Sequence, residues 1–263
     1  MSNGSAGAAA VRPPRQVRAP NASPLTLDGT RTYLVGVDQL AIIDPGPALP
    51  DHLAKVTKAV DDARLVTILL THGHPDHAAA AAPLSARLHG PIRSLAAGTL
   101  QPGDVIPTDA GDLVAVPTPG HASDHVAFHW PRARAAFCGD LMLGGQDSTL
   151  VAPPEGHLAA YLASLERLRA LDLAVIYPAH GEPFTDPDAA IAAYIHHREQ
   201  RRRQVLEALA AGPAAEEALA ERIYRPTDPG LRAAAIGATQ AYLIDLEHRG
   251  QVRALGHGRW GRT

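Results

Sequence analysis

The sequence predicts a layered α/β protein followed by a small helical module. The chain has 263 residues, of which 46% are hydrophobic and 4% aromatic, so it can bury a large core built mainly from aliphatic side chains. Short apolar runs alternate with helical patterns as far as Pro187. Beyond Pro187 these runs give way to long helical segments, which indicates a second, smaller unit.

The composition excludes several classes of protein. No apolar run reaches the ~20 residues that a transmembrane helix needs, so we expect no membrane partner. The single cysteine, Cys138, cannot close an internal disulfide, which argues against a disulfide-rich secreted protein and favours a cytoplasmic one. The net charge is −3, and residues 28–197 hold ten basic and nineteen acidic residues. A core that binds nucleic acid by bulk charge alone shows the opposite balance.

Proline and glycine delimit the elements of the first half. Residues 1–24 are rich in small residues, proline and arginine and lack apolar periodicity, which predicts a disordered tail. The run LVTILL (65–70) is apolar without alternation, as in a strand buried on both faces. Turn and breaker residues place the other boundaries. We therefore expect, in order, strands at 32–37 and 40–44, a helix at 50–61, a strand at 65–70 and a helix at 78–90.

The second half has short strand patterns and then helices alone. Within the core we expect strands at 112–117, 125–130 and 134–138, a helix at 157–171 and a strand at 173–178. Helices at 188–211, 214–224 and 231–250 and a terminal hairpin then predict a winged-helix-like module. The predicted domains are a tail at 1–24, a core at 25–197 and the module at 198–263.

The strongest chemical signal follows the LVTILL strand directly. The segment THGHPDH (71–77) holds four potential metal ligands within six residues. His72 and His74 are two apart on an extended segment and so project toward the same side. The proline after His74 breaks this extension, which lets Asp76 and His77 turn toward a second position. Imidazole and carboxylate groups are ligands that suit Zn²⁺.

Three further candidate ligands follow other predicted strands. His121 comes after the strand at 112–117, Asp140 after the one at 134–138, and His180 after the one at 173–178. Loops at strand ends converge at the edge of a sheet, where functional residues are commonly placed. A chance run of surface histidines would not explain these additional positions.

This pattern resembles the metallo-β-lactamase superfamily over nearly the whole chain. Its HxHxDH motif and its later ligands are matched, in order, by His72, His74, Asp76, His77, His121, Asp140 and His180. The resemblance implies an αββα four-layer sandwich that binds two zinc ions, with iron or manganese as alternatives. It implies that one ion is held by His72, His74 and His121, and the other by Asp76, His77 and His180, with Asp140 bridging the two.

Within the superfamily, the chain is most similar to the lactamase-β-like protein 2 group, which is related to glyoxalase II. The segments SPLTLDGTRTYLVG, TPGHASDH, FCGD and YPAHG resemble segments of that group, which typically has a winged-helix-like tail. Arg31 stands where the group has asparagine. Members of the group include an endoribonuclease that acts on single-stranded RNA, and relatives that act as thioesterases.

The resemblance implies a dinuclear zinc hydrolase that uses a metal-bridging hydroxide on a small ester or thioester. Asp76 is then catalytic as well as a ligand, because it can orient the hydroxide or accept its proton. The acidic core favours an acyl substrate over RNA. The alternatives are an endoribonuclease for single-stranded RNA, which the basic C-terminal part favours, and a non-catalytic binding module. A second copy of the chain, forming a homodimer, is a candidate protein partner under each of these functions.

Three features outside the ligand set receive supporting or structural interpretations. Asp44 and His125 are expected to hydrogen-bond behind the ligands rather than to act in the chemistry. The charge run Arg201–Arg203 is expected to be a solvated helix face, with a nucleic-acid-binding patch as the alternative.

Overall fold

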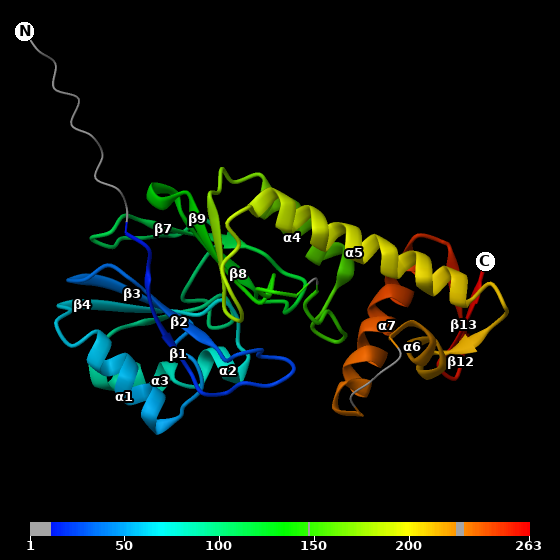
Figure 1. The fold of residues 1–263 in the computed structure, drawn as a ribbon, viewed down its shortest axis with the longest axis horizontal. Coiled ribbons are helices and arrows are strands. Elements are labelled where there is room, and N and C mark those ends of the chain that lie inside the picture. Colours follow the sequence, from blue (N-terminus) through cyan, green and yellow to red (C-terminus); the bar gives the residue numbers. More distant parts are fainter. Residues whose placement is uncertain (1–11, 147, 225–228) are drawn as a thin grey trace, which may run out of the picture.

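Two five-stranded sheets face each other in the computed structural model, which describes residues 12–146, 148–224 and 229–263. The strand orders are β1-β2-β3-β4-β5 and β10-β9-β8-β7-β6. Helices cover the outer face of each sheet (Figure 1). The helix–sheet–sheet–helix layers confirm the predicted αββα sandwich.

The first sheet combines antiparallel and parallel strands. Its strands are β1 (Arg15–Arg18), β2 (Arg31–Val35), β3 (Gln39–Ile43), β4 (Leu65–Leu69) and β5 (Ile92–Arg93). The pairs β1–β2 and β2–β3 are antiparallel, whereas β3–β4 and β4–β5 are parallel. The outer face is covered by α1 (Pro50–Ala59) and α3 (Ala81–Leu88), with Val56 and Leu84 packed against Ile42 and Ile68.

The helix predicted at 78–90 differs from the structure. A short helix, α2 (Pro75–Ala78), begins at the proline of the THGHPDH segment, and α3 starts three residues after it ends. The backbone N–H of Ala80 donates to Gly46 O at 2.9 Å, outside the helix. This hydrogen bond interrupts the helical ladder, and it fixes α2 and its ligand residues against the loop after β3.

The tail predicted at 1–24 is ordered in part. β1 pairs with β2 from Arg15 opposite Leu34 to Arg18 opposite Arg31. An edge strand of this kind is held by backbone hydrogen bonds and leaves most of its side chains exposed, so it needs no apolar pattern. Disorder was therefore the wrong expectation for residues 15–18, and residues 1–11 lie outside the described part of the chain.

The second sheet stacks on the first through aromatic side chains. Its strands are β6 (Val105–Ile106), β7 (Leu113–Pro117), β8 (Val126–Trp130), β9 (Ala135–Gly139) and β10 (Val175–Pro178). Neighbours are antiparallel except β9 and β10. Tyr33 and Leu69 of the first sheet share a buried cluster with Phe128, Trp130 and Phe137 of the second. A 3₁₀ turn, η1 (Pro131–Ala133), joins β8 to β9, and α4 (Leu158–Arg169) with α5 (Pro187–Ala208) covers the outer face.

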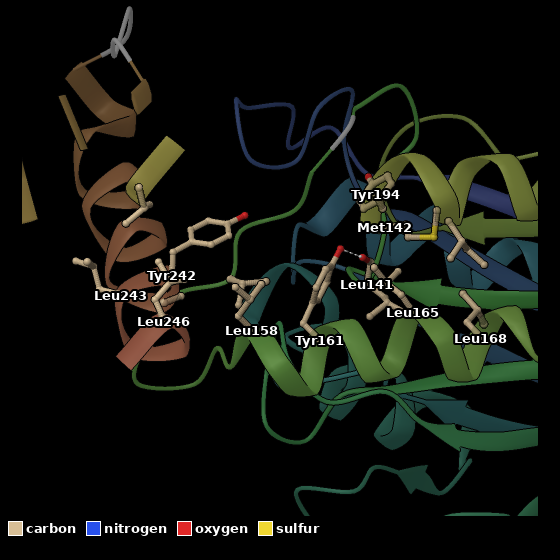
Figure 2. Packing of buried hydrophobic residues seen from close by; sticks show 14 of the residues in the cluster. Leu141, Met142, Leu158, Tyr161, Leu165, Leu168, Tyr194, Tyr242, Leu243 and Leu246 are labelled. Atoms are coloured by element: carbon tan, nitrogen blue, oxygen red, sulfur yellow. Dashed lines mark hydrogen bonds between the residues drawn. The ribbon is translucent and has the colours of Figure 1, made fainter. Parts of the chain in front are cut away.

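The long helix α5 continues from the core into the C-terminal module (Figure 1). The module contains β11 (Ala214–Ala215), α6 (Glu216–Tyr224), η2 (Pro229–Leu231), α7 (Arg232–His248), β12 (Val252–Gly256) and β13 (Arg259–Arg262), with strand order β11-β13-β12. Leu158 and Tyr161 on α4 and Tyr242 on α7 belong to one buried cluster (Figure 2). Core and module therefore share a continuous hydrophobic interior, and the boundary placed at 198, which falls within α5, stays a prediction.

None of the helices in the described residues is long and apolar enough to cross a lipid bilayer.

Candidate metal centre

Four loops at strand ends bring the predicted ligands together. The THGHPDH segment follows β4, His121 lies in the loop after β7, Asp140 directly follows β9, and His180 lies in the loop after β10. Hydrogen bonds also join strand starts of one sheet to loops of the other, from Val126 N of β8 to Thr71 O at 2.8 Å and from Arg31 N of β2 to Ala179 O at 2.7 Å. All seven predicted residues fall into groups whose ligand atoms lie within 4.8 Å of one another.

His72, His74 and His121 form the first group. His72 Nε2 lies 2.9 Å from His74 Nδ1, which lies 3.1 Å from His121 Nε2. Imidazole nitrogens bound to one Zn²⁺ at ~2.0–2.1 Å would lie about 3.3 Å apart in a tetrahedral arrangement. The three nitrogens therefore converge at nearly the spacing that a metal ion requires.

Asp76, His77 and His180 form the second group, and Asp140 lies between the two groups. Asp76 Oδ2 lies 3.5 Å from His77 Nε2 and 3.3 Å from His180 Nε2. Asp140 Oδ1 lies 3.4 Å and 3.3 Å from the same two nitrogens, and its Oδ2 lies 3.7 Å from His121 Nε2. Asp140 thus directs one oxygen toward each group, which is the position of a bridging ligand.

Three buried polar atoms, two in the second group and one on Asp140, lack a hydrogen-bond partner. They are His77 Nε2, Asp140 Oδ1 and His180 Nε2. An unsatisfied buried polar atom costs about 1–3 kcal/mol, and such atoms are rare in folded proteins. Coordination to a divalent metal ion would satisfy all three, so the residues present fit a metal centre.

The second nitrogen of each ligand histidine contacts an oxygen outside the centre. His77 Nδ1 lies 2.9 Å from Asp44 Oδ2, and His74 Nε2 lies 3.1 Å from Glu155 Oε2. The other three contacts are His72 Nδ1 to Thr71 Oγ1 at 3.1 Å, His121 Nδ1 to Leu150 O at 2.7 Å and His180 Nδ1 to Gly29 O at 3.4 Å. A hydrogen bond donated by one ring nitrogen leaves the lone pair of the other facing the centre. These contacts favour the metal-binding tautomer of all five rings.

Asp44 and His125 support the centre from behind. Asp44 accepts hydrogen bonds from the backbone N–H and the hydroxyl of Thr71, at 2.8 Å and 2.7 Å. His125 Nδ1 lies 2.8 Å from Thr118 Oγ1, and its Nε2 accepts from the backbone N–H of Asp140 at 3.2 Å. These contacts agree with the hydrogen-bonding roles expected for both residues.

Glu155 was not identified from the sequence. It lies in the loop before α4, and its side chain is 57% exposed. A single glutamate in a proline-containing loop belongs to no recognisable pattern, so only the fold reveals that it contacts His74.

The protonation states follow from burial and from neighbouring carboxylates. Burial lowers the pKa of His72 and of His121, so these rings are neutral. Burial also disfavours the charged form of His77, but Asp140 and Asp44 outweigh it and raise the pKa of His77 well above its ordinary value. Burial opposes ionisation of Asp140, yet the positive charge of His77 holds the pKa of Asp140 well below its ordinary value. A metal ion binding at the second group would therefore displace the His77 proton.

The turn before His121 requires glycine. Gly120 has a φ of +138°, and a Cβ at this position would lie 2.3 Å from the Tyr161 Cα. Only glycine allows the loop to pass this close to α4. The close approach places His121 within reach of His72 and His74.

Both ligand groups open into one cavity of about 560 Å³. Its wall on the side of the centre includes His74, Asp76, His121 and Asp140. The remaining wall comes from residues 23–27, from the loop after β9, from α5 through Arg198, and from α6 and α7. The module thus helps to enclose the space above the predicted ligands, and the cavity has the size of a small-molecule site.

Two families match the chain. The family described as "Metallo-beta-lactamase superfamily" matches residues 25–98 and 86–180, and "Beta-lactamase associated winged helix domain" matches residues 216–260. The first match covers more than half of the chain. The superfamily and the winged-helix module predicted from the sequence are confirmed, whereas the lactamase-β-like protein 2 group stays a prediction.

Similar proteins include enzymes and solved structures. The "Atrochrysone carboxyl ACP thioesterase" of Aspergillus chevalieri is 38% identical over 211 residues, covering 74% of this chain and 66% of that protein. The chain spans 57–66% of the length of the curated relatives it matches. A "Beta-lactamase domain protein from Burkholderia ambifaria" has a TM-score of 0.81 at 24% identity, covering 95% of this chain and 91% of that one. "TTHA1623 in a di-iron-bound form" has a TM-score of 0.53 at 29% identity, covering 65% and 94%.

Proposed function

Because the chain belongs to the metallo-beta-lactamase superfamily, we propose that it is a dinuclear zinc hydrolase acting on a small thioester or ester. The observation that carries this proposal is the pair of ligand groups, joined by Asp140, at one end of a cavity large enough for an acyl group. The similarity to a protein named as a thioesterase favours the thioester. Iron and manganese remain alternatives to zinc, and the di-iron form of TTHA1623 supports a centre with two ions.

The seven predicted residues would hold the metal ions in the two groups described above. Bound divalent ions would supply a water of lowered pKa and an electrophile for the carbonyl oxygen. Among the chain's own groups, Asp76 is placed to accept a proton. Burial opposes its ionisation, but the neighbouring rings of His180 and His77 lower its pKa, so the carboxylate is ionised at neutral pH. Its Oδ2 points toward the second group and lies beside the cavity.

The cavity walls favour an acyl substrate over RNA. Leu25, Leu143 and Leu150 line the cavity and offer apolar surface to an acyl chain bound there. Among the described lining residues, Arg198 is the one lysine or arginine. Single-stranded RNA is held by several cationic contacts to its phosphates. Endoribonuclease activity stays an alternative, which the experiment described next also tests.

The test measures hydrolysis of a short acyl thioester by thiol release, alongside cleavage of labelled single-stranded RNA. The proteins are wild type, Asp76→Ala, and Asp51→Ala as an exposed control on α1. We expect zinc-loaded wild type to cleave the thioester, a chelator to abolish cleavage and zinc to restore it. Asp76→Ala should lose at least about 100-fold in kcat, because a positioned proton acceptor contributes about that much.

Two results would overturn the proposal. Metal-dependent cleavage of RNA without thioester cleavage would move the protein to the endoribonuclease alternative. Asp76→Ala protein that lacks metal in the second group but retains the wild-type rate would remove the dinuclear mechanism.

A further inference from the structure

Arg198 is a buried cation on the wall of the catalytic cavity. It lies in the middle of α5, is 2% exposed, and lines the cavity that holds the predicted ligands. Its guanidinium donates from Nη1 to Tyr242 Oη at 3.2 Å and from Nη2 to Thr149 O at 2.6 Å. It also stacks over the ring of Tyr161, at 4.6 Å from the centroid. The two tyrosines belong to the cluster between α4 and α7 shown in Figure 2.

The guanidinium has no carboxylate partner in the described part of the chain. Its contacts are to the hydroxyls of two tyrosines, a backbone carbonyl and an aromatic ring, and its Nε has no hydrogen-bond partner. A buried charge is costly unless an opposite charge compensates it. The tyrosine ring compensates only in part, because a cation–π contact is weaker than a buried ion pair.

The other buried arginines among the described residues are paired. Arg202, one helical turn beyond Arg198, forms two hydrogen bonds to Asp245, at 2.8 Å and 3.0 Å. Arg31 pairs with both Asp28 and Glu182. Neither of these two lines the cavity. The unpaired guanidinium is thus the one that a bound molecule can reach.

The position of Arg198 limits where the missing anion sits on a substrate. Thr149 O accepts from Arg198, and the next carbonyl, Leu150 O, accepts from the ligand residue His121 at 2.7 Å. Two hydrogen bonds to consecutive carbonyls therefore connect the guanidinium to the His121 ring, and both side chains line the same cavity. An anion bound by Arg198 therefore lies near the scissile bond and not at the far end of a long leaving group.

We propose that Arg198 binds a carboxylate on the acyl group of the substrate, so that the preferred substrates are thioesters or esters of dicarboxylic acids. The planar guanidinium offers a fork of donors that matches a carboxylate. The apolar side chains of Leu143, Leu150 and Leu231 line the same cavity. They suit the aliphatic or aromatic part of the substrate between the scissile carbonyl and the free carboxylate. This substrate class rests on the proposed hydrolytic function.

The kinetic test compares two series of thioesters in zinc-loaded protein. One series runs from succinyl to suberyl and ends in a free carboxylate, and the other has the same lengths and ends in a neutral primary amide. For the best-fitting length we expect a wild-type preference of about 10- to 100-fold in kcat/KM for the carboxylate, as for a charge-assisted hydrogen bond. Arg198→Gln should reduce this ratio to near one, and Arg198→Lys should retain part of it. Arg203→Gln, an exposed arginine on the same helix, is the matched control.

A ratio measured within one variant is insensitive to a general loss of activity caused by altered packing. If Arg198 only joins core and module, its replacement will lower both rates and leave the ratio unchanged, which would overturn the proposal. A wild-type ratio of one would overturn it as well. If the preference instead follows a phosphate on the leaving thiol and disappears in Arg198→Gln, the anion belongs to the leaving group and the acyl assignment is wrong.

Calorimetry separates this proposal from the proposed function. A dicarboxylate product and its monoamide each offer one carboxylate to the metal centre, and only the dicarboxylate offers a second. We expect the dicarboxylate to bind wild type at least about 10-fold more tightly, and Arg198→Gln to bind both equally. If no thioester is hydrolysed, the proposed function fails, and this binding difference still decides the role of Arg198. Equal affinities in wild type would overturn the role of Arg198 even in an active hydrolase.

Discussion

Replacing Asp44 with asparagine should weaken metal binding at the second ligand group. Asp44 is 2% exposed, and its Oδ2 accepts from His77 and from the Thr71 hydroxyl while its Oδ1 accepts from the Thr71 N–H. Its φ of +50° is a conformation that asparagine also adopts, so the backbone should be retained. An amide can direct its oxygen to one side only, so whichever way it turns, its NH₂ group faces a former donor.

The expected magnitude follows from the role of Asp44 as the partner of a ligand. Loss of such a partner typically costs 10–100-fold in metal affinity, or about 1.4–2.7 kcal/mol. Affinity is measured by competition with a chelating dye, and metal content by elemental analysis after dialysis. Asp51→Asn, on the exposed side of α1, is the matched control. Asp44→Asn protein that is folded by near-ultraviolet circular dichroism and binds two ions with wild-type affinity would refute the reasoning.

Two further predictions concern the stability of the metal-free protein, measured by urea unfolding. Gly120→Ala should lower the free energy of unfolding by about 3 kcal/mol or more, because its methyl group would meet the Tyr161 backbone at a positive φ. Gly98→Ala, also at a positive φ but with no atom within 4 Å, should cost only about 1 kcal/mol, and equal midpoints would contradict this explanation. Burial lowers the pKa of His125 to about 3, so the folded state binds fewer protons than the unfolded state between that pH and about 6.5. The stability that neutral His125 contributes is complete above about pH 6.5 and is lost as the pH falls toward 3. In His125→Gln the free energy of unfolding should therefore fall less steeply over this range, by up to about 1.4 kcal/mol per pH unit. The same slope in wild type and His125→Gln would contradict this explanation.

The candidate ligands could be singled out in the sequence because they follow predicted strands. The apolar run before THGHPDH and the strand patterns before His121, Asp140 and His180 are local signals that survive in a single sequence. Which ligands form each group depends on how the two sheets stack. The sequence offered that grouping only through a family resemblance, and it stays a prediction, although the seven side chains lie in candidate groups whose ligand atoms are within 4.8 Å of one another.

The supporting residues were harder to predict because their partners are distant in the sequence. Glu155 reaches His74 across more than eighty residues, and neither residue belongs to a pattern that includes the other. The buried stripe of α5 includes Ile191, Tyr194 and Val205, but also Arg198 and Arg202. The charge run at Arg201–Arg203 was expected to be a solvated face, and this is wrong for Arg202, which is buried against Asp245. Because two of the buried positions of α5 carry arginine, its sequence lacks the apolar periodicity from which burial is inferred.

The core and the module contribute different parts of the candidate site. The outer partners of the candidate ligand histidines, among them Asp44, Thr71 and Gly29, belong to the core. The module and α5 instead supply the cavity wall, including Arg198 and the small residues of α7. The two parts meet at Thr149 and Leu150, where consecutive carbonyls accept from Arg198 and from His121. Substitutions in α7 should therefore change which acyl groups are accepted, whereas substitutions at residues 149–150 act on substrate binding and on the metal centre together.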